Sequence, residues 1–181
     1  MSFVDPRFLN EESGASGDDH PHADVRNGEA FLNTIYNAVT ASPNWANTVL
    51  VMSYDEWGGF FEHIPPTTAP DNNPGNALRG FRVPCVIVSP FARRDYVAST
   101  VFDHTSVLKM IESQWNLQPL TARDAAANNL RDALDLTQHN TPAPRFNVPA
   151  GPFGGPCAAA APAELEWEPL LELARASGWK V

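Results

Sequence analysis

The 181-residue sequence contains few cysteines and no long hydrophobic run. Its two cysteines, Cys85 and Cys157, stand far apart and form no CxxC pair, so they predict neither a zinc knuckle nor a disulfide framework. Their spacing leaves open whether they pair with each other. No apolar stretch reaches the roughly 18 residues of a membrane-spanning helix. The first residues, Met1–Pro6, show neither the basic region nor the apolar core of a signal peptide. We therefore expect no transmembrane segment and see no signal peptide.

Basic residues are also scarce. The chain has 12 Lys and Arg against 21 Asp and Glu, which gives a formal net charge of −9. This balance argues against nucleic acid as the main partner, because binding to phosphates requires basic surface. The hydrophobic content of 43% argues against a wholly disordered chain. The 17 prolines lie mostly outside the periodic segments, so we expect much ordered, irregular loop.

The hydrophobic pattern predicts helices and strands in alternation. We expect helices over residues 28–41, 105–115 and 122–130, and strands over residues 48–54 and 83–88. The run over 48–54 is continuously apolar and rich in β-branched residues, which is typical of a strand buried on both faces in a parallel sheet. Residues 55–80, between the strands, form a long loop of the length that usually carries function or is disordered.

This order of elements predicts the α/β class, with a layered and mostly parallel sheet. Two strands are too few for a complete sheet, so the chain is interpreted as part of a larger α/β domain or as a domain that needs a partner. Residues 1–140 would form that part. Residues 141–162, rich in Pro, Ala and Gly, are predicted to be a linker, and residues 163–181 a short helical segment with its helix over 168–177.

Two adjacent carboxylates, Asp55 and Glu56, follow the first predicted strand. Ligands of open α/β sheets bind outside the carboxyl ends of the strands. Neighbouring carboxylates repel each other unless a cation lies between them, and a hard divalent cation suits them. His63 follows seven residues after Glu56, as a candidate ligand or hydrogen-bond donor. The alternative is a turn with solvated acidic side chains.

Three other places carry candidate residues. His20 lies among Asp and His residues that suit a metal or phosphate site, although such clusters are often solvated; the neighbouring His22 is interpreted as a surface residue. Asp103 and His104 open the helix predicted from about residue 105, either as cap residues or facing an anion at the helix N-terminus. Arg93 follows the second strand, where a guanidinium suits phosphate. We regard Asp103, His104 and Arg93 as weak candidates for substrate binding.

Taken together, the motifs resemble a bacterial phosphoesterase family that groups phospholipases C with a type of acid phosphatase. The matching stretches are Val4-Asp-Pro-Arg-Phe8, Asp19-His-Pro21, Ala23-Asp-Val-Arg-Asn-Gly-Glu29, Tyr54-Asp-Glu-Trp-Gly-Gly-Phe-Phe-Glu-His-Ile-Pro-Pro66, Arg82-Val-Pro84, Ser89-Pro-Phe-Ala-Arg93 and Phe102-Asp-His-Thr-Ser-Val-Leu-Lys109. They follow one another in the family's order over roughly residues 3 to 136.

The resemblance implies an alkaline-phosphatase-like α/β/α sandwich and the hydrolysis of phosphoric esters. It implies that Asp55 and Glu56 hold a divalent metal ion. It assigns catalytic roles near the phosphate to His20 and His63. The family has Asp before the second histidine, whereas this chain has Glu62, which puts a close role for position 62 in doubt.

The family's Glu-Asn metal element and its Ser or Thr nucleophile have no match here, so the sequence resembles the C-terminal part of the family only. We therefore expect the nucleophile to lie outside this chain. A missing N-terminal half would complete the site, and without it the uncovered sheet edge and apolar helix faces favour self-association. The alternative is a non-catalytic remnant, or a fragment that binds a metal or an anion.

Metal identity stays open among Ca, Mg, Mn and Zn. The substrate stays open between a phospholipid and a phosphomonoester. Members of the family are often exported, but the sequence leaves the localisation of this chain open.

Overall fold

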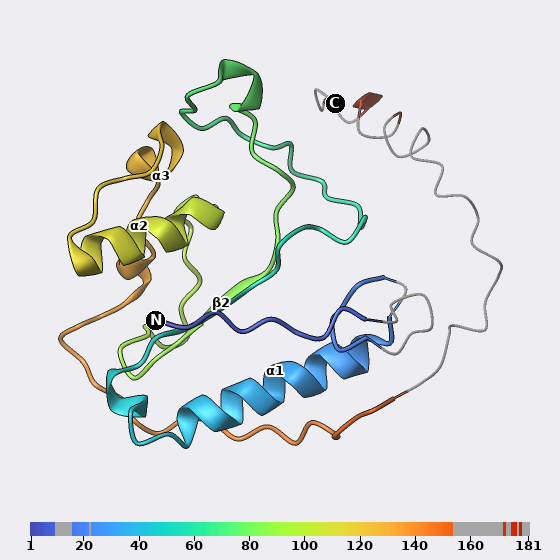
Figure 1. The fold of residues 1–181 in the computed structure, drawn as a ribbon, viewed down its shortest axis with the longest axis vertical. Helices are drawn as coiled ribbons and strands as arrows, with labels where there is room; N and C mark the ends of the chain where they lie inside the picture. Colours follow the sequence, from blue (N-terminus) through green and yellow to red (C-terminus); the bar gives the residue numbers. More distant parts are fainter. Residues whose placement is uncertain (10–15, 22, 154–171, 173–174, 177, 179–181) are drawn as a thin grey trace. The chain divides into compact units, whose positions relative to one another are not determined.

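The computed structural model describes residues 1–9, 16–21, 23–153, 172, 175–176 and 178 (Figure 1). These residues form a mixture of helices and strands. In chain order the elements are α1 (Val25–Thr40), the 3-10 helix η2 (Trp45–Asn47), β1 (Leu50–Ser53), the 3-10 helix η3 (Pro74–Asn76), β2 (Cys85–Val88), α2 (His104–Trp115), α3 (Ala122–Ala126) and the 3-10 helix η4 (Leu130–Ala133). The predicted helix over 168–177 falls mainly on residues outside those described.

The chain divides into two compact units. The first consists of Met1–Thr48 and the described part of Thr141–Leu170, and the second of Val49–Asn140 and the described residues of Leu171–Val181. Candidate residue His20 therefore lies in the first unit. The Asp55–His63 segment lies in the second.

In the first unit, α1 packs along the proline-rich segment that starts at Thr141. The buried Tyr36 donates its hydroxyl to the carbonyl of Pro144 at 2.6 Å, and its ring meets Phe146 at 5.3 Å. The buried Trp45 donates its indole Nε1–H to the carbonyl of Thr141 at 2.7 Å. Residues 141–146 are thus bound to α1 and η2 through side chains that also make up the core of this unit.

In the second unit, β1 and β2 pair in antiparallel register, from Leu50 opposite Val88 to Ser53 opposite Cys85. This differs from the mostly parallel sheet that the sequence predicts. A parallel pair needs a crossover that returns the chain to the end of the sheet where the first strand began. Here residues 54–84 instead lead into β2, which runs alongside β1 in the opposite direction. The Tyr54 N–H donates to the Pro84 carbonyl at 3.4 Å, so the pairing extends one step past the strands.

The predicted burial of the first strand on both faces is wrong. The first three residues of β1 are half-buried and Ser53 is exposed. The strand has a single paired neighbour among the described residues. The second strand begins at Cys85 rather than at residue 83, because Pro84 has no N–H to donate to the ladder.

Caps define the ends of the helices in this unit. At the N-terminus of α2, Asp103 forms a capping box with Ser106, and Asn116 ends the helix in the left-handed conformation. The helix predicted over 122–130 is shorter, because α3 ends at Ala126. Asn129 then accepts the Arg131 N–H and starts η4 instead.

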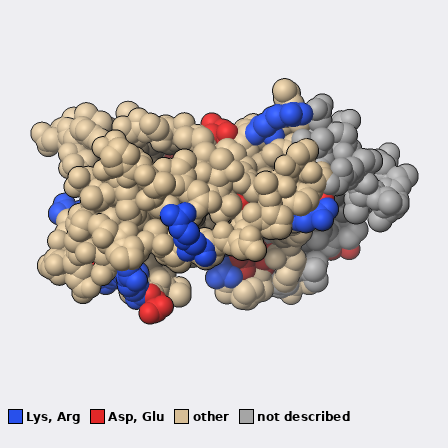
Figure 2. All heavy atoms as spheres, turned by 90° about the horizontal axis from the view of Figure 1, so that it is seen from below, with Lys and Arg blue, Asp and Glu red and all other residues tan. Residues whose placement is uncertain are grey.

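The buried apolar core of the described residues is small. Its members are Tyr36, Trp45, Ala69, Leu130 and Leu134. Many large apolar side chains are exposed in the second unit, including Phe60, Phe61, Val97, Trp115, Leu117 and Leu120. On the face drawn in Figure 2, the Lys and Arg side chains of the described residues stand apart, with mostly uncharged atoms between them. None of the described helices is both long and apolar enough to cross a bilayer.

Candidate functional site

Asp55 and Glu56 lie in the turn that directly follows β1, and both are exposed. Asp55 Oδ1 accepts the N–H of Glu56 at 3.1 Å, and Glu56 Oε2 accepts the N–H of Gly58 at 2.8 Å. Gly58 and Gly59 have φ values of 69° and 77°, a conformation that other residues rarely adopt. The two glycines therefore allow the tight turn that presents both carboxylates beside the end of the strand.

His63, on the same loop, has a side chain that is 73% exposed. Its Nδ1 lies 3.2 Å from Glu62 Oε1. Glu62 itself accepts two parallel hydrogen bonds from the Arg82 guanidinium, at 2.6 and 2.7 Å. The Arg82 guanidinium, opposed by burial and helped by the Ile64 N–H, lowers the pKa of Glu62 to about 2. Glu62 is therefore a charged carboxylate beside His63, and its ion pair with Arg82 connects the loop to the segment that precedes β2.

Within the described residues, no group of three or more His, Cys, Asp and Glu side chains stands close enough together to hold a metal ion. The structure thus places Asp55 and Glu56 side by side and His63 on the same loop. It does not join them with a third ligand. Their metal-binding role stays a prediction.

His20 is exposed on a turn that precedes α1. Its backbone N–H donates to Asp18 Oδ1 at 3.3 Å, and its carbonyl accepts the N–H of Ala23 at 2.8 Å. Asp18 is only 8% exposed and also accepts the Ser16 hydroxyl at 2.7 Å. The turn that carries His20 is thus fixed through a buried carboxylate.

Gly28 of α1 lets this turn approach the helix. A Cβ at this position would lie 1.9 Å from Asp19 Oδ1 and 2.8 Å from the backbone carbonyl carbon of Asp18. Glycine inside a helix costs about 1 kcal/mol relative to alanine, so the close contact gives this glycine a structural reason.

Asp103 caps α2, as one of the two interpretations predicts. Its carboxylate accepts the N–H and the hydroxyl of Thr105 at 2.9 and 2.6 Å, and the Arg79 Nε–H at 2.8 Å. Burial raises the pKa of Asp103, but the hydrogen bonds from Thr105 and Arg79 outweigh it and hold the pKa below its ordinary value. His104, the next residue, has its Nε2 2.8 Å from the carbonyl oxygen of Tyr54.

Arg93 is exposed, and its guanidinium lies 5.1 Å from the centre of the Tyr96 ring. This stacking occupies one face of the guanidinium and orients it. The role of Arg93 in substrate binding stays a prediction, as do those of Asp103 and His104.

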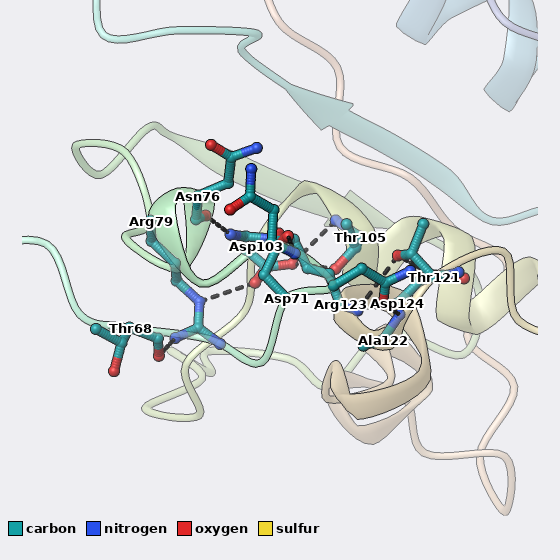
Figure 3. Close-up of polar contacts among 12 residues, drawn as sticks. Thr68, Asp71, Asn76, Arg79, Asp103, Thr105, Thr121, Ala122, Arg123 and Asp124 are labelled. Carbon is teal, nitrogen blue, oxygen red and sulfur yellow. Dashed lines mark hydrogen bonds and ion pairs between the residues drawn. The ribbon is translucent and has the colours of Figure 1, made fainter.

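The sequence did not single out two arginines that bind the long loop to the helices (Figure 3). Arg79 contacts the Thr68 carbonyl, the Thr67 hydroxyl at 3.2 Å and Asp103. Arg123 of α3 contacts Asp71 Oδ2 at 3.0 Å and the carbonyl of Asn76. The sequence shows that acidic and basic residues occur in and around the long loop. It does not show which acidic residue binds which arginine.

Comparison with known proteins places this sequence in a family. The Phosphoesterase family matches over residues 1–118, so the chain belongs to that family. It is 33% identical over 166 residues to non-specific phospholipase C6 of Arabidopsis thaliana, covering 80% of this chain and 32% of the relative. It is 32% identical over 173 residues to phospholipase C A of Mycobacterium tuberculosis, covering 82% and 32%. The chain therefore spans about a third of the length of these curated relatives.

Proposed function

We propose that this chain carries the cation-binding carboxylates of an enzyme that hydrolyses phosphoric esters, of the phospholipase C or acid phosphatase type. The observation that carries the proposal is the family match over residues 1–118, which includes Asp55 and Glu56. The relatives named as phospholipases C align over most of the chain and give the substrate class its support.

The donors present fit a divalent cation. Asp55 and Glu56 are adjacent, exposed and anionic, and carboxylate oxygens suit Ca²⁺, Mg²⁺ and Mn²⁺. When bound, such an ion neutralises phosphoryl oxygens and activates a nucleophile. In the proposed site, the two carboxylates hold the cation. His63, on the same loop, would donate a hydrogen bond to a phosphoryl oxygen or protonate the leaving group. The catalytic role of His20 stays a prediction.

We propose that the nucleophile and the remaining ligands come from polypeptide outside these 181 residues. The chain spans about a third of its relatives, and the second unit exposes many large apolar side chains. In that larger protein, β1 and β2 would join further strands of an alkaline-phosphatase-like sandwich, and residues 1–140 would form its C-terminal part.

Hydrolysis of p-nitrophenylphosphorylcholine and p-nitrophenyl phosphate tests the proposal. We expect weak or no turnover by the isolated chain, because the proposed nucleophile lies outside it, and any turnover should require an added divalent cation. Asp55→Asn with Glu56→Gln should reduce it to background, because both charges that hold the cation are removed. Asp95→Asn, at an exposed residue of the same unit with a positive φ that Asn tolerates, is the matched control.

Turnover that needs no cation, or that survives in the double variant, contradicts the proposal. A folded chain that binds the cation but hydrolyses neither substrate agrees with a nucleophile outside these 181 residues, and also with the alternative, a non-catalytic fragment that binds a metal ion.

A further inference from the structure

The loop that carries the candidate site begins and ends against the N-terminus of α2. Tyr54 lies directly before Asp55, and Thr67 and Thr68 lie directly after the Pro65-Pro66 pair. These two ends are 13 residues apart in the sequence, counted from Tyr54 to Thr67. Both are held by contacts that lead to two consecutive residues, the N-cap Asp103 and the first residue of α2, His104.

The start of the loop is held by His104. Its ring Nε2 lies 2.8 Å from the Tyr54 carbonyl oxygen, and a carbonyl can only accept. Nε2 therefore carries the hydrogen atom and is the donor of this hydrogen bond. This contact fixes the backbone one residue before Asp55.

The end of the loop is held by Asp103 through Arg79. The Arg79 side chain is 20% exposed, and its guanidinium donates Nε–H to Asp103 Oδ2 and Nη1–H to the Thr68 carbonyl (Figure 3). The same Nη1 donates to the Thr67 hydroxyl at 3.2 Å. Asp103 is itself immobilised, because its other oxygen accepts two hydrogen bonds from Thr105. The planar fork of an arginine makes such a bridge rigid.

We propose that Asp103 and His104 are positioning residues. His104 binds the start of the 54–68 loop, and Asp103 binds its end through Arg79. Together they fix the positions of Asp55, Glu56 and His63. This assignment rests on the function proposed above for Asp55 and Glu56. A carboxylate pair on an open loop binds a cation poorly unless the surrounding contacts hold it in place. The two residues therefore act on the loop rather than on a substrate.

Paired substitutions at His104 separate positioning from direct chemistry. Glutamine places an amide N–H near the position of Nε2, and asparagine places one near Nδ1. We expect His104→Gln to keep amide hydrogen exchange of residues 54–60 at the wild-type level, and His104→Asn to raise it. Mn²⁺ affinity, measured by electron paramagnetic resonance, should fall about tenfold in the asparagine variant and stay unchanged in the glutamine variant.

Arg79→Lys tests the end of the loop at Thr67 and Thr68. This test is independent of His104 and remains available if the His104→Asn variant fails to fold. Lysine keeps the charge but cannot bridge Asp103 and Thr68 together, so amide hydrogen exchange should rise at residues 67–69. Arg131→Lys, at an exposed arginine of η4, is the matched control and should change neither readout.

Loss of Mn²⁺ affinity in both His104 variants, with hydrogen exchange unchanged, would overturn the proposal, because His104 would then act on the ligand directly. Unchanged exchange in His104→Asn and in Arg79→Lys would also overturn it. If exchange rises as expected but the wild-type chain binds no Mn²⁺, the closure of the loop is supported and the proposed cation site fails.

Discussion

Glu62 stands where the resembled family has aspartate, and the structure gives this longer side chain a partner. Its two oxygens meet the Arg82 guanidinium in a bidentate pair, which is the strong form of a carboxylate–arginine contact. The longer side chain of Glu62 thus connects the candidate loop to the segment before β2 through Arg82. The sequence showed the substitution but not the arginine 20 residues further on.

The titration of Glu62 should reveal this pair. Its pKa is lowered from 4.5 to about 2, so the folded state holds the proton less tightly than the unfolded chain. The stabilisation is therefore present above about pH 4.5 and is lost as the pH falls through that value towards 2. Carboxyl-carbon NMR of Glu62 should give a midpoint near 2.

Arg82→Gln is the comparison for that titration. We expect the Glu62 midpoint to move back towards 4.5 and the acid-side loss of stability over this window to become smaller. A wild-type midpoint near 4.5 would show that the pair does not form in solution.

At the scale of elements, the close approach of α1 and the His20 turn depends on Gly28. Alanine there would place a Cβ 2.8 Å from backbone that cannot move cheaply. We expect Gly28→Ala to destabilise the first unit by about 1–3 kcal/mol, the usual cost of overpacking, despite the better helix propensity of alanine.

Urea unfolding followed by circular dichroism measures the effect of Gly28→Ala. Glu29→Ala and Glu29→Gly, compared with each other at an exposed position of the same helix, are the control for helix propensity. A Gly28→Ala variant as stable as the wild type would mean that the turn does not pack on α1.

The positions of the elements could largely be predicted, and their pairing could not. The apolar stripe of Phe31, Ile35 and Val39 predicts α1, and the α2 helix begins and ends within a residue of its expected range. The continuous apolar runs of both strands were interpreted as parallel, yet the strands pair antiparallel. Strand direction is set by the path of residues 54–84 between the strands, which a hydrophobic pattern does not encode.

The candidate site was predictable to the same degree. Asp55, Glu56 and His63 follow a strand, and the structure places them on one loop, because position after a strand is a local property. The contacts that hold the loop come from Arg79, Asp103 and His104, which lie 11 to 50 residues away from their partners. Such pairings depend on tertiary structure, so the pattern of the sequence could not identify them.

At the scale of the whole molecule, the described residues bury few large apolar side chains for a chain of 181 residues. A domain of this size ordinarily buries on the order of 70% of its unfolded surface. The exposed apolar side chains and the span of about a third of the relatives both agree with a chain that forms one part of a larger phosphoesterase.

The central claim is that the carboxylates of Asp55 and Glu56 bind a divalent cation. Titration of the chain with Mn²⁺, followed by electron paramagnetic resonance, tests it without requiring turnover. The account predicts one saturable site that is lost in the Asp55→Asn/Glu56→Gln variant and retained in Asp95→Asn. Saturable binding that is unchanged in the double variant, or no binding by the folded wild-type chain, would contradict it.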